Sequence, residues 1–127
     1  MIEQIFAIRG ATTASANEKS CIEKATIELM QEILIKNNFA NNKRLEISDI
    51  IISTTSDLTA YYPATALRQS KLVDVPLFSA IEPNVENSLP LCIRLLVRVA
   101  NYGERQIPKH VYLHEAITLR PDLISKE

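Results

Sequence analysis

The chain has 127 residues, with 14 lysines and arginines against 15 aspartates and glutamates, and a formal net charge of −1. This length suffices for one domain with a hydrophobic core, and the balanced charge lacks the basic excess of proteins that bind nucleic acid or membrane surfaces. We therefore expect a single domain over residues 1–127, with neither nucleic acid nor a membrane as a partner.

The low glycine count, the lack of long apolar runs and the two cysteines exclude further classes of protein. The chain has two glycines, so it has no glycine-rich phosphate loop and no dinucleotide-binding fingerprint. No apolar run approaches the roughly 20 residues that span a bilayer, and the start MIEQIFAIRG does not predict a signal peptide. Cys21 and Cys92 lie far apart without metal-ligand spacing, which favours a reducing, cytoplasmic location.

The first half of the chain predicts a strand, a long helix and a second strand. Residues 3–10 form an apolar run that we expect to end at Gly10. Residues 17–39 have helical spacing, with Asn17 as the expected N-cap. The apolar stripe of this helix consists of Ile22, Ala25, Leu29, Met30 and Ile33. The β-branched run DIIISTT, residues 49–55, predicts a buried strand.

The second half predicts one short helix and three strands. Pro63 suits the first turn of a helix within residues 56–72. The predicted strands cover residues 75–82, 91–100 and 110–118. Residues 119–127, broken by Pro121, are expected to be a mobile tail. The fold class is therefore α+β or α/β, with one long helix on a mixed sheet, and oligomerisation is the simplest cover for the other face.

Two arginines interrupt the apolar stretch PLCIRLLVRVAN, residues 90–101. Side chains alternate along a strand, so Arg94 and Arg98 share one face while the other face is wholly apolar and must belong to the core. An unpaired buried guanidinium is costly, so both arginines must face a cleft, a neighbouring subunit or water. The spacing alone leaves solvated arginines and a binding site both open.

Other candidate groups stand at the ends of predicted strands. Arg9 ends the first strand, Glu82 ends LFSAIE, and Tyr112 shares a predicted strand face with His110 and His114. Each of these also fits an ordinary surface charge or strand aromatic. The two histidines have no evident third metal ligand, and no nucleophile–base pair stands out. Arginines with one carboxylate and one tyrosine suit non-covalent binding of a small polycarboxylate.

Five segments have a recognisable order and spacing. They are IRGATT (8–13), TTSDLTAYYPATALRQ (54–69), PLFSAIE (76–82), CIRLLV (92–97) and HVYLHEAITLRPDL (110–123). Together they resemble the monofunctional chorismate mutases of the trimeric, pseudo-α/β-barrel class. The resemblance implies a homotrimer with active sites at its subunit interfaces. It also implies the Claisen rearrangement of chorismate to prephenate, on the route to phenylalanine and tyrosine, with no metal, cofactor or covalent intermediate.

The resemblance assigns a role to each matching position. Arg94 matches the cation that binds the ether oxygen as negative charge grows there, and Glu82 matches the carboxylate that accepts a hydrogen bond from the ring hydroxyl. Arg9 matches the arginine that grips a substrate carboxylate, with Tyr112 beside it. The further substrate-binding positions are Arg68, Tyr62, Ala64, Thr65, Leu77, Phe78, Ser79, Leu119 and Arg120.

Some positions depart from the family pattern, and two other functions compete. Thr65 stands where the family often has lysine, so one positive charge is missing, and Ser79 stands where a cysteine is often found. Arg98 matches no family role, and we expect an ordinary surface or interface charge. Trimeric enamine/imine deaminases share the fold but lack the IRGATT and LRPDL segments. A non-catalytic trimeric carboxylate binder would have little reason to keep four dispersed polar residues.

Overall fold

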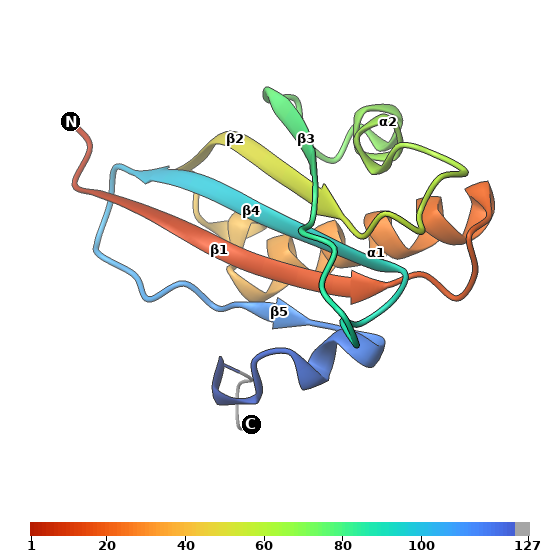
Figure 1. Ribbon diagram of the computed structural model, residues 1–127. Helices are drawn as coiled ribbons and strands as arrows, with labels where there is room; N and C mark the ends of the chain where they lie inside the picture. Colours follow the sequence, from red (N-terminus) through yellow and green to blue (C-terminus); the bar gives the residue numbers. More distant parts are fainter. Residues whose placement is uncertain (124–127) are drawn as a thin grey trace.

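The computed structural model describes residues 1–123 as a five-stranded mixed sheet with two helices (Figure 1). The strand order is β3-β2-β4-β1-β5; β4 is antiparallel to β1 and β2, whereas β5 is parallel to β1 and β3 is parallel to β2. The strands are β1 (Gln4–Thr13), β2 (Leu45–Thr54), β3 (Leu77–Ile81), β4 (Cys92–Asn101) and β5 (Val111–Tyr112). The helices are α1 (Lys19–Lys36) and α2 (Pro63–Ser70), with short 3-10 helices at Phe39–Asn41, His114–Thr118 and Pro121–Leu123. This arrangement confirms the predicted α+β mixed sheet.

The core lies between the sheet and the helices. The alternation predicted for β4 is confirmed, since one of its faces is buried against α1 and α2. The fully buried side chains of this layer include Ile8, Ile22, Leu29, Met30, Ile33, Ile50, Ile52, Leu67, Ile93, Val97 and Val99. The long helix and the helix that begins at Pro63 were both predicted.

Gly10 does not end the first strand, contrary to expectation, because β1 continues to Thr13. A Cβ atom at Gly10 would lie 2.6 Å from Cδ1 of Ile33 and 3.3 Å from Cδ1 of Leu29. The missing side chain therefore lets α1 approach the sheet closely at this point. The glycine marks a close contact within the strand, not a turn.

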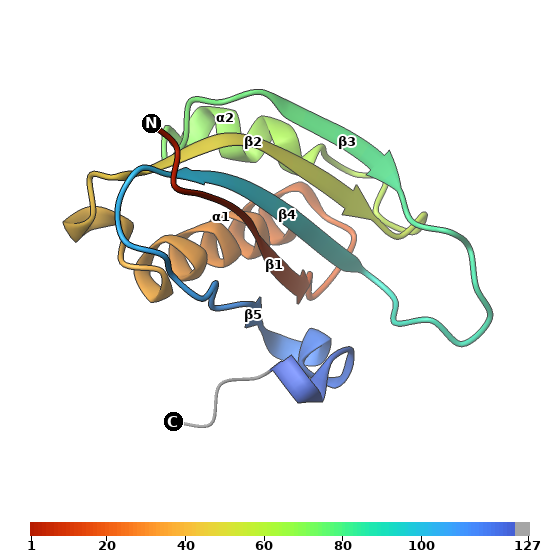
Figure 2. The ribbon, with the colours of Figure 1, turned by 90° about the vertical axis from the view of Figure 1, so that its left-hand side faces the viewer.

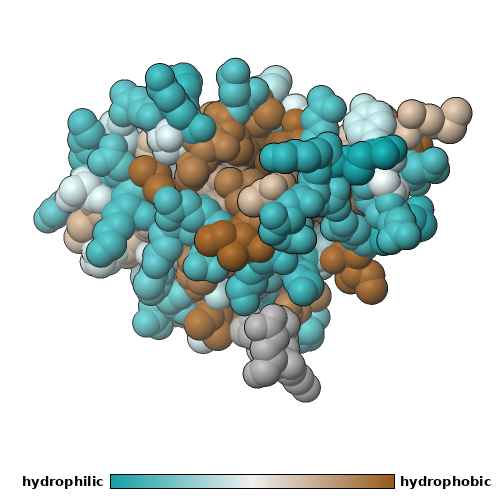
Figure 3. Space-filling model, turned by 180° about the vertical axis from the view of Figure 1, so that it is seen from behind, coloured by the Kyte–Doolittle hydropathy of each residue, from teal (hydrophilic) through white to brown (hydrophobic). Residues whose placement is uncertain are grey.

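The other face of the sheet is not covered by a helix of the described residues (Figure 2). Within residues 1–123, the loop after β3 crosses in front of β4 and β1 (Figure 1). Large apolar side chains on this open face reach solvent, among them Ile5 at 73% exposed and Phe78 at 68%. From the helix side, by contrast, the surface is mostly hydrophilic with separate hydrophobic patches (Figure 3). An exposed apolar sheet face next to charged groups is typical of an interaction surface.

The predicted strand over residues 110–118 is wrong beyond Tyr112. His114 has φ of 53°, in the left-handed region, and the chain then forms the 3-10 helix His114–Thr118. The period-two alternation therefore ends, and His114 turns to α1, where its Nε2 lies 2.7 Å from Oε1 of Glu28. The two histidines do not share a strand face, and no cluster of potential metal ligands occurs within residues 1–123.

Two boundaries also differ from the predictions in the first half. Helix α1 begins at Lys19 after Glu18, which makes no side-chain cap. Asn17 instead holds the loop before α2, because its Oδ1 accepts hydrogen bonds from the backbone N–H groups of Thr59 and Ala60, both at 3.0 Å. Strand β2 begins at Leu45 rather than at residue 49, with a bulge after Ile47 that breaks the alternation of its first half.

The remaining predictions about the chain ends are only partly addressed. No helix within residues 1–123 is both long and apolar enough to cross a membrane. Of the predicted mobile tail, residues 121–123 form a 3-10 helix, and residues 124–127 lie outside the described residues.

Candidate active site

The open face of the sheet carries a hollow between two arginines. In the strand register, Arg94 on β4 lies opposite Ala11 of β1 and Ser53 of β2, while Arg9 on β1 lies opposite Leu96. Because alanine and serine are small, the surface beside Arg94 is sunken. The resulting hollow of about 220 Å³ is lined by Arg9, Gly10, Ala11, Ile51, Ser53, Arg94, Leu95, Leu96 and Tyr112. Three of the four expected catalytic residues therefore meet in one cavity.

Glu82 joins this group through an ion pair with Arg94. The backbone N–H of Glu82 donates to the carbonyl of Thr54 at 2.8 Å, which extends the pairing of β3 with β2 by one residue. This brings the carboxylate to β4, where its Oε1 contacts the buried Nε of Arg94. The Nε donates no well-aligned hydrogen bond within the described residues, although the charges are in contact. The side chain of Arg94 remains 43% exposed and that of Glu82 20%, so the guanidinium is oriented but still open to a ligand.

A second hollow, of about 600 Å³, adjoins the same arginine. It is lined by Thr55, Glu82, Pro83, Val85, Asn87, Ser88, Leu89, Cys92, Arg94, Thr118 and Leu119. Leu119 was expected to close over ligand, and it lies here on the wall formed by the C-terminal segment. Burial raises the pKa of the Cys92 thiol more than the charge of Arg94 lowers it, so the thiol is uncharged at neutral pH. Cys92 is therefore not a candidate nucleophile.

Arg9 and Arg120 differ in how their charges are balanced. Arg9 is exposed and forms no salt bridge within residues 1–123. Arg120 forms a two-point pair with Asp122, from Nε to Oδ1 at 3.0 Å and from Nη2 to Oδ2 at 2.8 Å. The hydrogen bonds from Arg120 hold the pKa of the Asp122 carboxyl below its usual range. Of these two arginines, Arg9 is therefore the one without a paired carboxylate within residues 1–123.

The remaining predicted substrate-binding residues do not join this cluster within one chain. Tyr62 and Ser79 line a different hollow of about 550 Å³, near Pro63 and Ile52, and Tyr62 is 71% exposed. The side chains of Leu77 and Phe78 lie on β3, while Thr65 and Arg68 lie on α2. Ala64 is buried in the core. The predicted site is thus divided into two groups, one near β1 and β4 and the other on β3 and α2.

Arg98 is exposed, as expected, but it is also ion-paired. It lies opposite Asp49 in the register of β2 and β4, and its Nε and Nη2 donate to the two carboxylate oxygens at 2.8 and 2.6 Å. These hydrogen bonds hold the pKa of Asp49 below its usual range. This partner could not be predicted from the strand pattern, because a cross-strand pair depends on register. Asp49 therefore takes two of the five N–H donors of this guanidinium and balances its charge.

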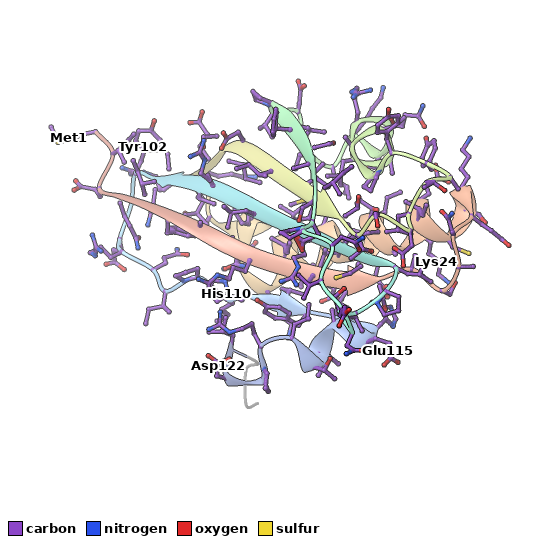
Figure 4. All side chains as sticks on the ribbon, in the orientation of Figure 1. Met1, Lys24, Tyr102, His110, Glu115 and Asp122 are labelled. Carbon is purple, nitrogen blue, oxygen red and sulfur yellow. The ribbon has the colours of Figure 1, made fainter. Side chains whose placement is uncertain are left out.

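His110 is a further residue whose placement the sequence pattern did not indicate. Its ring lies beside β1, at the start of the segment that leads through β5 toward Asp122 (Figure 4). Its Nδ1 accepts a hydrogen bond from the backbone N–H of Arg9 at 2.9 Å. It is therefore in direct contact with one of the expected substrate-binding residues.

The fold and the site define an α+β protein with two arginines, a carboxylate and a tyrosine gathered on an open sheet face. The family model described as chorismate mutase type I matches residues 5–123. The chain belongs to this family, as the resemblance predicted. The match does not support the alternative of an enamine/imine deaminase.

Individual relatives agree with the family match over nearly the whole chain. The chain is 40% identical over 120 residues to chorismate mutase AroH of Thermus thermophilus, covering 94% of this chain and 97% of the relative. It is 34% identical over 120 residues to chorismate mutase AroH of Bacillus subtilis (strain 168), covering 94% and 92%. The solved structure of a chorismate mutase from Clostridium thermocellum has a TM-score of 0.78 and 36% identity, covering 89% of this chain and 98% of that one.

Proposed function

We propose that this chain is a chorismate mutase that converts chorismate to prephenate in the hollow between Arg9 and Arg94. The observation that carries the proposal is the cluster itself, in which the two arginines and Tyr112 line one cavity and Glu82 contacts Arg94. Chorismate carries two carboxylates, so two accessible guanidinium groups in one hollow suit it. Membership of the chorismate mutase family supports the same substrate.

The proposed chemistry is a rearrangement within one molecule. The ether C–O bond breaks as a new C–C bond forms, and no proton, electron or group leaves the substrate. Negative charge grows on the ether oxygen in the transition state, so a fixed guanidinium there stabilises the transition state more than the reactant. Arg94 is the proposed donor, because Glu82 fixes its Nε side while the rest of the head stays accessible. Arg9, beside Tyr112, would bind a carboxylate and help to hold the reactive conformer.

The reaction requires no metal and no cofactor, and this sets the primary test. Purified protein should consume chorismate and form prephenate well above the spontaneous rate, with a metal chelator present throughout. The disappearance of chorismate is followed by its absorbance, with protein-free buffer as the control. A rate equal to that control would refute the enzyme proposal and favour a non-catalytic binder.

We further propose that three copies of the chain form a homotrimeric pseudo-α/β-barrel, with each active site shared by two neighbouring subunits. Two observations support sharing. The open sheet face exposes apolar side chains such as Ile5 and Phe78, which a neighbour would cover. The expected site residues are also divided between two regions of one chain, and the group on β3 and α2, which includes Arg68, would reach the β1–β4 hollow of a neighbour. A closed ring of three satisfies this head-to-tail contact.

The free thiols of Cys21 and Cys92 fit a proposed cytoplasmic location.

The trimer has a direct physical test. Light scattering coupled to gel filtration should give a mass three times the 14.3 kDa of the chain. The mass should persist on dilution to assay concentration, since the site needs two subunits. An active species with the mass of one chain would contradict the shared site.

A further inference from the structure

His110 makes a contact that a neighbouring strand would normally make. In β1, Ala11 directs its backbone groups toward β5, where its carbonyl accepts the N–H of Leu113 at 2.9 Å. Backbone groups of alternate residues point to the same edge, so the N–H of Arg9 also faces β5. The β1–β5 pairing, however, comprises only Gly10 and Ala11. The ring Nδ1 of His110 accepts the Arg9 N–H instead, at 2.9 Å.

A buried asparagine holds the backbone of the residue before the ring. If the parallel register continued by one residue, the carbonyl of Lys109 would be the acceptor for the Arg9 N–H. That carbonyl already accepts Nδ2 of Asn37 at 3.0 Å, and the Lys109 N–H donates to Oδ1 of Asn37 at 2.9 Å. Asn37 is itself fixed at the end of α1, because Nδ2 also donates to the carbonyl of Ile33 at 2.9 Å. The segment before His110 is therefore clamped to α1, and the imidazole is held against Arg9.

The charges around this ring are positive. The charges of Arg9 on β1 and of Arg120 in the C-terminal segment act on it, and Arg120 is itself paired with Asp122. Burial, together with these two cations, lowers the pKa of His110 from its ordinary value of 6.5. A neutral imidazole that accepts at Nδ1 carries its proton on Nε2, whereas a protonated ring donates from both nitrogens and cannot accept the Arg9 N–H.

We propose that neutral His110 is a positioning residue, which fixes the main chain of Arg9 at the sheet edge and so sets the affinity for the substrate carboxylate. This inference rests on the proposed role of Arg9 in binding chorismate. Protonation of the ring replaces an acceptor by a donor facing the Arg9 N–H, and it adds a third cation beside Arg9 and Arg120. Arg9 is then displaced, and KM for chorismate rises while kcat changes less. The added positive charge by itself would attract a dianionic substrate and lower KM. A rise in KM on acidification therefore indicates displacement of Arg9, whereas a fall indicates simple electrostatic attraction.

Two substitutions at this position distinguish hydrogen bonding from mere packing. In His110→Asn, the amide oxygen takes the place of Nδ1 as the acceptor and does not titrate. This variant should keep a KM near that of the wild type at pH 8 and should lose the rise in KM that we expect of the wild type below pH 6.5. In His110→Leu the acceptor is gone, so KM should be about tenfold higher at every pH, on the scale of one lost hydrogen bond.

The chain offers a matched control in its only other histidine, His114, which contacts Glu28 outside the candidate site. His114→Asn should keep the wild-type dependence of KM on pH. The proposal is overturned if His110→Asn shows the same rise in KM on acidification as the wild type, if KM of the wild type falls on acidification, or if His110→Leu lowers kcat without raising KM. Circular dichroism of each variant identifies any loss of folding.

A spectroscopic test does not depend on turnover. With two histidines in the chain, comparing wild type with His110→Asn assigns each imidazole in nitrogen NMR spectra. His110 should be the Nε2–H tautomer at neutral pH, and its midpoint should lie below 6.5. An Nδ1–H tautomer, or a midpoint above the ordinary value, would overturn the proposal in a folded protein. If the protein does not convert chorismate at all, the proposed function fails, while this measurement still decides the hydrogen bond.

Discussion

Replacing Arg94 by alanine should lower kcat for chorismate by at least about 10²-fold, the scale seen when one donor to a developing oxyanion is removed. Arg94 lines both hollows on the open face, and Glu82 orients its guanidinium. The proposed contact with the ether oxygen strengthens as the C–O bond breaks, so the loss should fall on kcat more than on KM. Steady-state kinetics on the folded variant measures both.

The same strand supplies the matched control for this experiment. Arg98→Ala removes the same type of side chain from the same face of β4, four residues away, where Asp49 already occupies the guanidinium. Its kcat should stay close to that of the wild type. The pair of exposed charges contributes little to stability, so the variant should also fold. A near-normal kcat for Arg94→Ala, or an equal loss in both variants, would remove Arg94 from the mechanism.

The two arginines of β4 also illustrate how far the sequence alone could lead. Alternation separates the apolar face of residues 91–99 from the face with Arg94 and Arg98, and the structure confirms this division. The partners of these arginines could not be predicted from the pattern. Asp49 and Glu82 reach β4 only through the registers of β2 and β3, including a bulge after Ile47. Register depends on long-range packing, and a one-residue slip would reverse every assignment.

The error at residues 110–118 has a different physical origin. The segment HVYLHEAI alternates in sequence, but the strand ends at Tyr112. His114 adopts a left-handed conformation, and the chain then forms a 3-10 helix. The pattern of a short segment does not contain the position at which its pairing with an adjacent strand ends. The same early end of β5 leaves the Arg9 N–H without a strand partner. The acceptor that replaces this strand partner, Nδ1 of His110, could therefore not be predicted from the sequence pattern.

The division of the expected site between two regions of the chain was not visible in the sequence either. Motif order and spacing assigned Arg9, Arg68, Glu82 and Arg94 to one expected site. The motifs carry no information on which subunit supplies each of these residues. The structure places Arg9 and Arg94 at one hollow and leaves Arg68 on α2 outside it. This separation is what makes the shared site testable by mixing two defective variants.

Mixing Arg94→Ala with Arg68→Ala subunits should restore activity that neither variant has alone. Under the proposed arrangement, a site between two subunits takes Arg94 from one and Arg68 from the next. An interface between an Arg68→Ala subunit and a following Arg94→Ala subunit then contains both arginines, whereas the other interfaces lack one or both. With random assembly of equal amounts, about a quarter of the sites are intact in a closed ring with one type of interface.

The measurement requires subunit exchange, by unfolding and refolding the mixture together, followed by a chorismate assay. The recovered kcat per site should approach a quarter of the wild-type value, while each variant refolded alone stays defective. The control is the double variant refolded with wild type, in which the intact sites also amount to about a quarter and no complementation is needed. If each site were built within one chain, the mixture of single variants would show only the average of their residual activities, because every subunit lacks one of the two guanidinium groups. Recovery in the mixture can arise only from a site that spans two subunits.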